Sequence, residues 1–303
     1  MPLLSLIVFA PLVGALLILS IPNTRIKLIQ GAALAAGSVC MILSGYLYFA
    51  FNKTTAAMQF IEKAAWIPAF NVNYSVGVDG LSVALVALTA LLTLVSIIYS
   101  FNITLRVKEF FFWFLLLEAG MLGVFVSLDF FLFYVFWELT LVPMYFLIGV
   151  WGGPKKEYAA IKFFLYTLFG SLFMLLGILA LYFNSAPHTF DMLELAEQGS
   201  LLPLNMQIWI FLALYVGFAI KIPAFPFHTW LPLAHVEAPT GVSVILAGVL
   251  LKMGTYGIMR VSFPVLPEAA KWFLPFLIVI AVINIIYGAF CAMAQKDLKK
   301  MVA

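Results

Sequence analysis

The decisive stretch of the sequence reads Gly217-Phe-Ala-Ile-Lys221-Ile-Pro223-Ala-Phe-Pro226. A lysine stands inside an apolar run, and two prolines follow it within five residues. Proline removes a backbone N–H and clashes with the preceding turn, so we expect a helix that breaks directly after Lys221. Inside a bilayer, such a break is tolerated only where protein or water satisfies the freed backbone groups. The stretch therefore predicts a broken transmembrane helix, with a buried cation and water beside the break.

The composition of the whole chain is that of a protein that crosses a membrane many times. Of the 303 residues, 65% are hydrophobic and 10% are charged, and the mean hydropathy is +1.13. A soluble domain is about half apolar and about a quarter charged. We therefore expect an all-α polytopic membrane protein with a retained, uncleaved first span. The expected spans are residues 2–20, 27–51, 77–100, 109–127, 130–150, 158–183, 206–233, 240–260 and 272–294.

Charge and cysteine content exclude several classes of function. The net charge of +3 is too small, against so much apolar surface, to indicate a nucleic-acid partner. Both cysteines, Cys40 and Cys291, lie in apolar runs, which indicates neither a disulfide framework nor a metal site. The sequence has no nucleotide-binding glycine loop and no cysteine cluster for iron–sulfur ligation, so we expect no cofactor and no metal on this chain.

Basic residues are distributed unequally over the two sides of the predicted membrane. One side holds Arg25, Lys27, Arg106, Lys108, Lys155, Lys156, Lys296, Lys299 and Lys300, and the other holds Lys53, Lys63, Arg260 and Lys271. Cytoplasmic loops carry an excess of Lys and Arg, which predicts that the first group is cytoplasmic and that the N-terminus is outside. The acidic segment 191–197 falls on the outer side, where we expect a short amphipathic surface helix.

Four ionisable residues lie deep inside the predicted spans: Glu118, Glu138, Lys221 and Lys252. Each charge near the bilayer centre costs ~2.5–3.5 kcal/mol on insertion scales, which makes each a candidate functional residue. The helical rise of about 1.5 Å per residue places Glu118, Glu138 and Lys252 roughly 12–17 Å from the outer turns, with Lys221 somewhat deeper. One interpretation is a structural Glu138–Lys221 ion pair, which would leave Lys252 without a partner. We favour a chain of titratable groups that carries protons.

Four further residues have two interpretations each. Lys162, four residues into its span, either extends its ammonium group to the interface or joins the relay. Glu118 is either a neutral, hydrogen-bonded acid or a member of the relay. His228 and His235, seven residues apart, are either satisfied by neighbouring helices or transfer protons, because imidazole both accepts and donates protons near neutral pH. Together with Glu237 they lack the ligand spacing of a zinc site.

Several motifs of this sequence resemble those of a known family. They are Trp137-Glu-Leu-Thr-Leu-Val-Pro143, Lys221-Ile-Pro-Ala-Phe-Pro-Phe-His-Thr-Trp-Leu-Pro232 and Leu251-Lys-Met-Gly-Thr-Tyr-Gly257, and the likeness continues to Gln295-Lys-Asp-Leu-Lys-Lys300. From about Asp79 to its end, the chain resembles the antiporter-like membrane subunits, of the subunit M type, of the bacterial proton-translocating NADH–quinone oxidoreductase, respiratory complex I.

The resemblance implies an antiporter-like fold of inverted five-helix repeats. An N-terminal unit of three helices would occupy residues 1–108, the first repeat residues 109–260, and an incomplete second repeat residues 261–303. We expect the sequence to continue beyond its last residue, where the family has a further glutamate on a second broken helix. One departure is Leu233, which stands where the family usually has an aspartate.

The resemblance also implies roles for the charged residues. Glu138 and Lys221 would form the central pair, Lys252 the next relay group, and His228 and His235 the groups after the break, which Pro223 and Pro226 create. The implied function is proton translocation in the bacterial plasma membrane, driven by other membrane and peripheral subunits that carry flavin and iron–sulfur clusters. Besides lipid and protons, no small-molecule substrate is expected.

Two other classes of function stay open from the sequence. One is a subunit of a multi-chain sodium/proton antiporter, which would use the same charged residues without redox chemistry. The other is an inert membrane scaffold in which the charges are structural.

Overall fold

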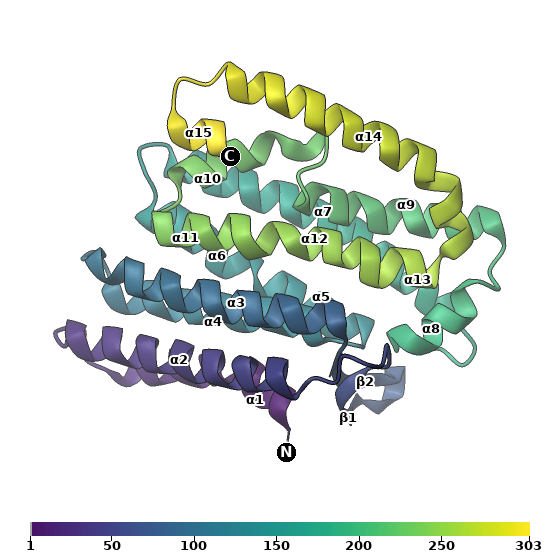
Figure 1. Ribbon diagram of the computed structural model, residues 1–303, viewed down its shortest axis with the longest axis horizontal. Helices are drawn as coiled ribbons and strands as arrows, with labels where there is room; N and C mark the ends of the chain where they lie inside the picture. The colour runs from purple at the N-terminus through teal and green to yellow at the C-terminus, as the bar shows by residue number, and fades with distance from the viewer. Residues whose placement is uncertain (1) are drawn as a thin grey trace.

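Nine helices within residues 2–303, the range that the computed structural model describes, are long and apolar enough to cross a membrane (Figure 1). This confirms the nine predicted spans. Their bounds are α1 (Leu3–Ser20), α2 (Ile26–Ala50), α3 with a 3₁₀ turn (Gly80–Asn102), α4 (Val107–Val126), α5 with α6 (Phe130–Leu139 and Leu141–Trp151), α7 (Lys156–Asn184), α9 (Leu204–Lys221), a composite helix (Thr240–Val265) and α14 (Pro267–Met293).

The spans lie side by side, from α1 and α2 at one edge of the bundle to α14 at the other (Figure 1). Helix α1 packs on α4, α7 packs on α9, and α14 packs on α9. The composite helix consists of α11 (Thr240–Ile245), a π-helix η4 (Leu246–Leu250), α12 (Leu251–Gly257), a second π-helix η5 (Ile258–Ser262) and α13 (Phe263–Val265). None of the most apolar window of α14 is buried, so this edge helix presents an uncovered apolar face.

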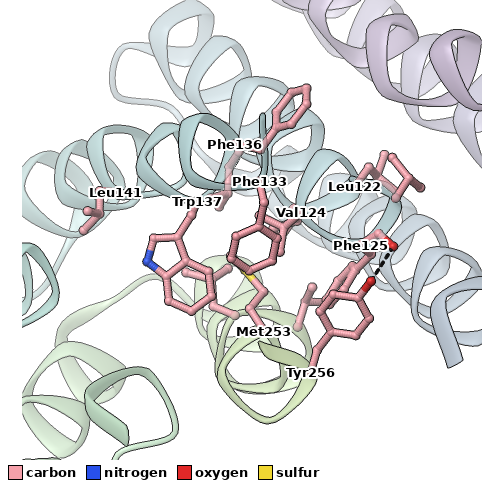
Figure 2. Packing of buried hydrophobic residues seen from close by; sticks show 14 of the residues in the cluster. Leu122, Val124, Phe125, Phe133, Phe136, Trp137, Leu141, Met253 and Tyr256 are labelled. Carbon is pink, nitrogen blue, oxygen red and sulfur yellow. Dashed lines mark hydrogen bonds between the residues drawn. The ribbon is translucent and has the colours of Figure 1, made fainter. Parts of the chain in front are cut away.

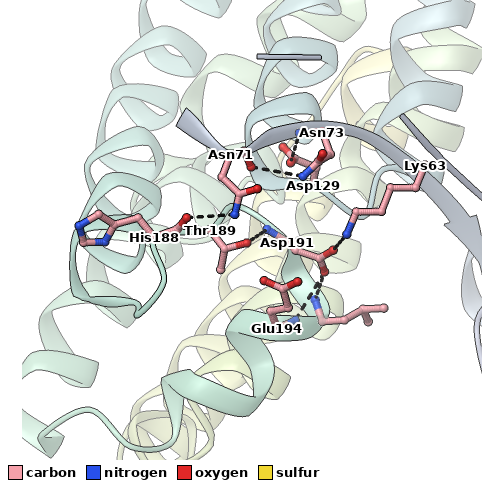
Figure 3. A network of polar contacts seen from close by, with 9 residues as sticks. Lys63, Asn71, Asn73, Asp129, His188, Thr189, Asp191 and Glu194 are labelled. Atoms are coloured by element: carbon pink, nitrogen blue, oxygen red, sulfur yellow. Dashed lines mark hydrogen bonds and ion pairs between the residues drawn. The ribbon is translucent and has the colours of Figure 1, made fainter. Parts of the chain in front are cut away.

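At one end of the bundle, a small sheet and a short helix lie together (Figure 3). The antiparallel strands β1 (Gln59–Ile67) and β2 (Val72–Val78) pair with each other, and α8 (Met192–Gly199) is the surface helix predicted at 191–197. The Nζ atom of Lys63 donates to Asp191 Oδ2 at 2.8 Å, and this hydrogen bond raises the pKa of Lys63. The predicted all-α fold is confirmed for the membrane spans, and the hairpin lies outside them, between the predicted spans 27–51 and 77–100.

Each of the four aspartates in the sequence caps the N-terminus of a helix. Asp79 caps α3, Asp129 caps α5, Asp191 caps α8 and Asp297 caps α15 (Leu298–Val302), and each carboxylate accepts backbone N–H groups of the first turn. A helix leaves its first N–H groups without an intrahelical partner, and aspartate is among the best residues to satisfy them. The aspartates therefore set where these four helices begin.

A polar cluster ties the composite helix to α3 and α4. Arg260 forms an ion pair with Asp79 and donates to Ser82 Oγ at 3.0 Å and to Tyr256 Oη at 3.2 Å. Burial alone would raise the pKa of Asp79, but hydrogen bonds from the Ser82 N–H and the Arg260 guanidinium hold it below its ordinary value. Tyr256 in turn donates to the carbonyl of Phe125, near the end of α4, at 3.0 Å. This cluster fixes the ends of three helices to one another.

Aromatic side chains fill the space between α4, α5 and α12 (Figure 2). Phe125 and Tyr256 meet edge to face with ring centres 5.2 Å apart, and Phe133 and Trp137 of α5 lie beside them with at most 1% of their surface exposed. Trp137 also contacts Phe218 of α9, with ring centres 5.7 Å apart. This packing places the last turn of α5, which carries Glu138, next to α9, which carries Lys221.

Candidate functional site

The predicted break after Lys221 is confirmed. Helix α9 ends at Lys221, and the chain becomes helical again as a 3₁₀ turn, η3 (Phe227–Trp230), followed by α10 (Leu231–Glu237). The predicted span 206–233 therefore contains a continuous helix only as far as Lys221. Pro232 lies in the first turn of α10, where its missing N–H leaves no bond unmade.

Protein groups satisfy the backbone that the break frees. The indole Nε1 of Trp230 donates to the carbonyl of Ile220 at 2.9 Å, and the N–H of Phe225 donates to Asn284 Oδ1 of α14 at 2.8 Å. A cavity of about 470 Å³ lies against the break, lined by Ile222, Pro223, His228, Thr229, Asn284 and Tyr287 among others. The cavity begins at Ile222 and Pro223, directly after Lys221, and Lys221 itself does not line it.

Lys221 is buried, with only 2% of its surface exposed. Its ammonium nitrogen lies 5.3 Å from the centre of the Trp137 ring and 5.9 Å from that of Phe163. It also donates to Thr140 Oγ1 at 3.5 Å. Aromatic faces attract cations, and more strongly away from water, so this setting holds the ammonium without a direct carboxylate partner.

Glu138 does not form the ion pair with Lys221 that one interpretation of the sequence expects. Within residues 2–303, the ion pairs shorter than 4.0 Å are Lys63–Asp191, Arg260–Asp79 and Lys271–Glu268. Glu138 Oε1 is buried without a hydrogen-bond partner in that same range. The two residues are neighbours that are not in contact.

Thr140, which contacts Lys221, was not identified from the sequence. It occupies the junction of α5 and α6, two residues after Glu138 and three before Pro143. Pro143 cannot donate to the carbonyl of Leu139, which explains why the helix is interrupted there. The Thr140 hydroxyl donates to the carbonyl of Trp137 at 2.8 Å and accepts from Lys221.

Lys252 lies on an exposed face of α12 and is not among the residues that contact the Lys221 ammonium group. Its Nζ atom donates to the carbonyl of Ala247 at 2.7 Å, and no hydrogen bond or ion pair within the described chain joins it to Glu138 or Lys221. Ala247 belongs to the π-helix η4, and π-helical turns occur frequently at functional sites. The structure therefore brings Glu138 and Lys221 together and leaves Lys252 at the surface.

Glu118 and Lys162 lie outside this group. Glu118 on α4 has no exposed surface, and neither carboxylate oxygen has a hydrogen-bond partner in residues 2–303, although Cys40 of α2 lies beside it. Both interpretations of Glu118, the hydrogen-bonded acid and the relay member, stay open. Lys162 is half-buried, with its Nζ atom 5.7 Å from the centre of the Tyr166 ring. Both of its interpretations stay open.

The two histidines follow the break on η3 and α10. His228 packs against Phe225 and Tyr287, with ring centres 5.8 and 5.1 Å away. His235 is buried, with 9% of its surface exposed. The Nδ1 atom of each has no hydrogen-bond partner in the described part of the chain, so neighbouring helices do not satisfy these imidazoles fully. No group of three His, Cys, Asp or Glu within residues 2–303 is arranged to hold a metal ion.

Comparisons with known proteins agree with this architecture. Residues 127–303 match the family model described as NADH:quinone oxidoreductase/Mrp antiporter, TM. The chain is 44% identical over 310 residues to NADH-quinone oxidoreductase subunit M of Rickettsia bellii (strain RML369-C), covering 100% of this chain and 62% of the relative. It is 43% identical over 302 residues to NADH-ubiquinone oxidoreductase chain 4 of Marchantia polymorpha, covering 99% of this chain and 60% of that protein. This chain thus spans about three fifths of the length of these relatives.

Solved structures show the same arrangement of helices. A chain of respiratory complex I from Thermus thermophilus with bound NADH matches with a TM-score of 0.86 and 32% identity, covering 100% of this chain and 61% of that chain. A chain of the Mrp complex from Dietzia sp. DQ12-45-1b matches with a TM-score of 0.84 and 24% identity, covering 99% of this chain and 32% of that chain, which shows the fold alone. The antiporter-like fold that the sequence motifs implied is confirmed. Fold, broken helix and sequence identity together show that the chain belongs to the NADH:quinone oxidoreductase/Mrp antiporter family of membrane proteins.

Proposed function

We propose that this chain is a proton-translocating membrane subunit of an NADH–quinone oxidoreductase, a translocase whose redox centres lie in partner subunits. The observation that carries the proposal is Lys221, a buried ammonium group at the end of a broken helix. Charges inside a membrane are expensive, and broken helices beside them are typical of ion-handling sites. The identity to proteins named NADH-quinone oxidoreductase subunit M supports the redox-linked form of the activity.

The proposed relay consists of Glu138, Lys221 and Lys252, with His228 and His235 beyond the break. Glu138 acts as an electrostatic switch: its negative charge favours the proton on Lys221, and loss of that charge favours release. Because Glu138 makes no ion pair with Lys221 in this structure, the proposed switch needs no direct contact between the two residues, and the Thr140 hydroxyl is the acceptor in contact with the ammonium. Lys252, exposed on α12, receives the proton along a hydrated path.

The remaining parts of the proposal follow from the resemblance. Residues 1–108 form an N-terminal three-helix unit, 109–260 the first repeat and 261–303 the start of the second. The protein lies in the bacterial plasma membrane, and its N-terminus is outside, which the distribution of basic residues predicts independently of the resemblance. It assembles with membrane and peripheral subunits of complex I, which hold flavin and iron–sulfur clusters. Protons are its only small-molecule substrate.

The test is to replace Glu138 in the assembled complex. Glu138→Gln and Glu138→Ala remove the switching charge, so we expect the loss of proton pumping and slower coupled electron transfer with assembly preserved. Glu138→Asp keeps the charge on a shorter side chain and should retain part of the activity. Proton yield per NADH in membrane vesicles is measured beside assembly on a native gel. Normal pumping by assembled Glu138→Ala contradicts the proposal.

A second candidate is a subunit of a sodium/proton antiporter, favoured by the match to the Mrp complex. The higher identity to the Thermus chain, 32% against 24%, supports the redox-linked assembly instead. Purification of the protein from its native membrane separates the two. Co-purifying hydrophilic subunits with flavin and iron–sulfur centres support the pump, and a wholly membranous, cofactor-free assembly supports the antiporter.

A further inference from the structure

The segment that follows the break, residues 225–238, is held at both ends by side chains from the last part of the chain. At its start, the N–H of Phe225 donates to Asn284 Oδ1 of α14 at 2.8 Å. At its end, the Nζ atom of Lys299 in α15 donates to the carbonyls of Val236 and Ala238 at 3.0 and 2.7 Å. The segment carries His228 and His235 and forms one wall of the cavity of about 470 Å³.

Asn284 meets a need that the break creates. The N–H of Phe225 follows Pro223 and lies outside the helix, and a backbone group without a hydrogen-bond partner is strongly unfavourable inside a membrane. Asn284 is a polar residue in the middle of α14, surrounded in sequence by Val282, Ile283 and Ile285. Placing a polar side chain in such an apolar run is unfavourable in a membrane. The hydrogen bond to the Phe225 N–H offsets this cost and satisfies the backbone at the break.

Lys299 meets a different need at the far end. The last carbonyl groups of a helix have no intrahelical partner, and a positive charge there is favourable. Lys299 supplies both a donor and a charge to the end of α10 (Leu231–Glu237). Its two acceptors, the carbonyls of Val236 and Ala238, lie in and directly after the last turn of α10, so α15 is tied directly to α10.

The same C-terminal part also contacts the first histidine. Tyr287, three residues after Asn284 on α14, lies edge to face against the His228 ring with centres 5.1 Å apart. One helix, α14, therefore holds both the backbone at the start of the segment and the imidazole that follows it.

We infer that Asn284 and Lys299 are positioning residues that hold segment 225–238, and thereby His228 and His235, in place beside the broken helix. Movement of α14 or α15 is transmitted to the histidines through these bonds. The consequence for transport rests on the proposed function, whereas the placement of the segment does not.

The experiment measures placement and transport separately in the full-length chain of the assembled complex. The parent carries Thr229→Cys, an exposed position in the segment, and Cys291→Ala. Into this parent we introduce Asn284→Leu, which removes the bond to Phe225, or Lys299→Ala, which removes the bonds to Val236 and Ala238. The matched substitutions are Asn284→Asp, which keeps an oxygen acceptor, and Lys299→Arg, which keeps charged N–H donors. Lys296→Ala is the matched control, since Lys296 is exposed and no side-chain hydrogen bond joins it to other residues within 2–303.

We expect Asn284→Leu to raise the maleimide labelling rate of the cysteine by about fivefold, the change for one lost hydrogen bond. Lys299→Ala removes two hydrogen bonds and should raise the rate by at least as much. Proton yield per NADH should fall in the same two variants. Asn284→Asp, Lys299→Arg and Lys296→Ala should stay close to the parent in both measurements.

Unchanged labelling in both bond-removing variants overturns the inference, whatever the proton yield. Faster labelling that Asp and Arg do not restore also overturns it, because the hydrogen bonds would then not be the cause. Faster, restorable labelling with full proton yield upholds the positioning and contradicts the proposed transport role of the segment. If Asn284→Leu fails to assemble, Lys299→Ala at the membrane surface decides the result.

Discussion

The hydroxyl of Thr140 is the polar group in contact with Lys221, so its removal isolates the hydrogen bond from the charge of Glu138. Thr140→Val keeps the shape of the side chain and removes the hydroxyl acceptor, whereas Thr140→Ser keeps the hydroxyl acceptor. Loss of one hydrogen bond to a buried ammonium costs about 1.5–3 kcal/mol, so we expect Thr140→Val to lower the proton yield per NADH and Thr140→Ser to preserve most of it.

Thr167→Val is the control for this substitution. Thr167 is equally buried, and its hydroxyl donates only to backbone carbonyls of its own helix, that of Phe163 at 2.7 Å and that of Phe164 at 3.3 Å. An equal loss of proton yield in Thr140→Val and Thr167→Val would show that threonine hydroxyls here serve the helix and not Lys221.

The site residues differ in how readily they can be identified from the sequence alone. Glu138 and Lys221 were identifiable because a charge in an apolar run is costly and demands a reason. Thr140 was not, because a threonine in a helix can satisfy its hydroxyl on its own backbone, and the sequence does not show which partner it also meets. The exposure of Lys252 could not be predicted from the sequence either. A helical projection assumes a constant 3.6 residues per turn, and the π-helices before and after α12 change that spacing.

At the scale of elements, the broken helix can be tested by removing its prolines. Pro223→Ala with Pro226→Ala restores two N–H donors and would stabilise an ordinary helix by up to ~3 kcal/mol per proline. A continuous helix would displace Phe225 from Asn284 and close the space after Lys221. We expect a complex that assembles and oxidises NADH with a lowered proton yield.

Proton yield in vesicles and assembly on a native gel are measured together for this double variant. An unchanged yield with normal assembly would mean that the prolines serve packing alone and that Lys221 is hydrated by another route.

The contact between the hairpin and α8 allows a matched comparison of two substitutions. Lys63→Ala removes an ion pair whose side chains are 46% and 10% exposed, which contributes up to about 1 kcal/mol. Asp191→Ala removes the same pair and also the N-cap of α8, which costs about 1 kcal/mol more. In thermal unfolding of the purified protein, the midpoint of Asp191→Ala should therefore lie below that of Lys63→Ala. The reverse order would contradict the role of Asp191 as the N-cap of α8.

The pH dependence of this contact follows from the raised pKa of Lys63. A group whose pKa is raised by folding contributes stability below its unfolded value, near 10.4 for lysine, and loses it as the pH rises through the folded value. The contact should therefore persist at neutral pH and weaken only in strong alkali, and Lys63→Ala should remove this alkaline change.

The elements differ in how well the sequence predicts them. Long apolar runs give the spans because only helices satisfy every backbone group within their own segment. The hairpin was missed because the residues of β1, Gln59-Phe-Ile-Glu-Lys-Ala-Ala-Trp-Ile67, show no alternation of apolar and polar residues. Its partners Asp129 and Asp191 lie far away in the sequence, and no local pattern connects them.

For the whole molecule, the unequal distribution of basic residues predicts the orientation in the membrane. Thr24→Cys lies in the basic loop after α1 and Thr54→Cys in the loop before β1, and both positions are exposed. In intact cells, an impermeant thiol reagent should label Thr54→Cys and not Thr24→Cys, because the positive-inside rule places Thr24 in the cytoplasm. The opposite pattern would invert the proposed orientation.

Arg260 makes one end of the composite helix a pivot. Its ion pair with Asp79, and the bond from Tyr256 to Phe125, fix that end to α3 and α4, while Lys252 is eight residues away along the same helix. At about 1.5 Å per residue the lever arm is about 12 Å, so a tilt of about 10° swings the backbone at Lys252 by about 2 Å. A rotation of that size is enough to make or break a hydrogen bond. Because α11, at the other end of the composite helix, packs on α3, a tilt about Arg260 would require that second contact to give way as well.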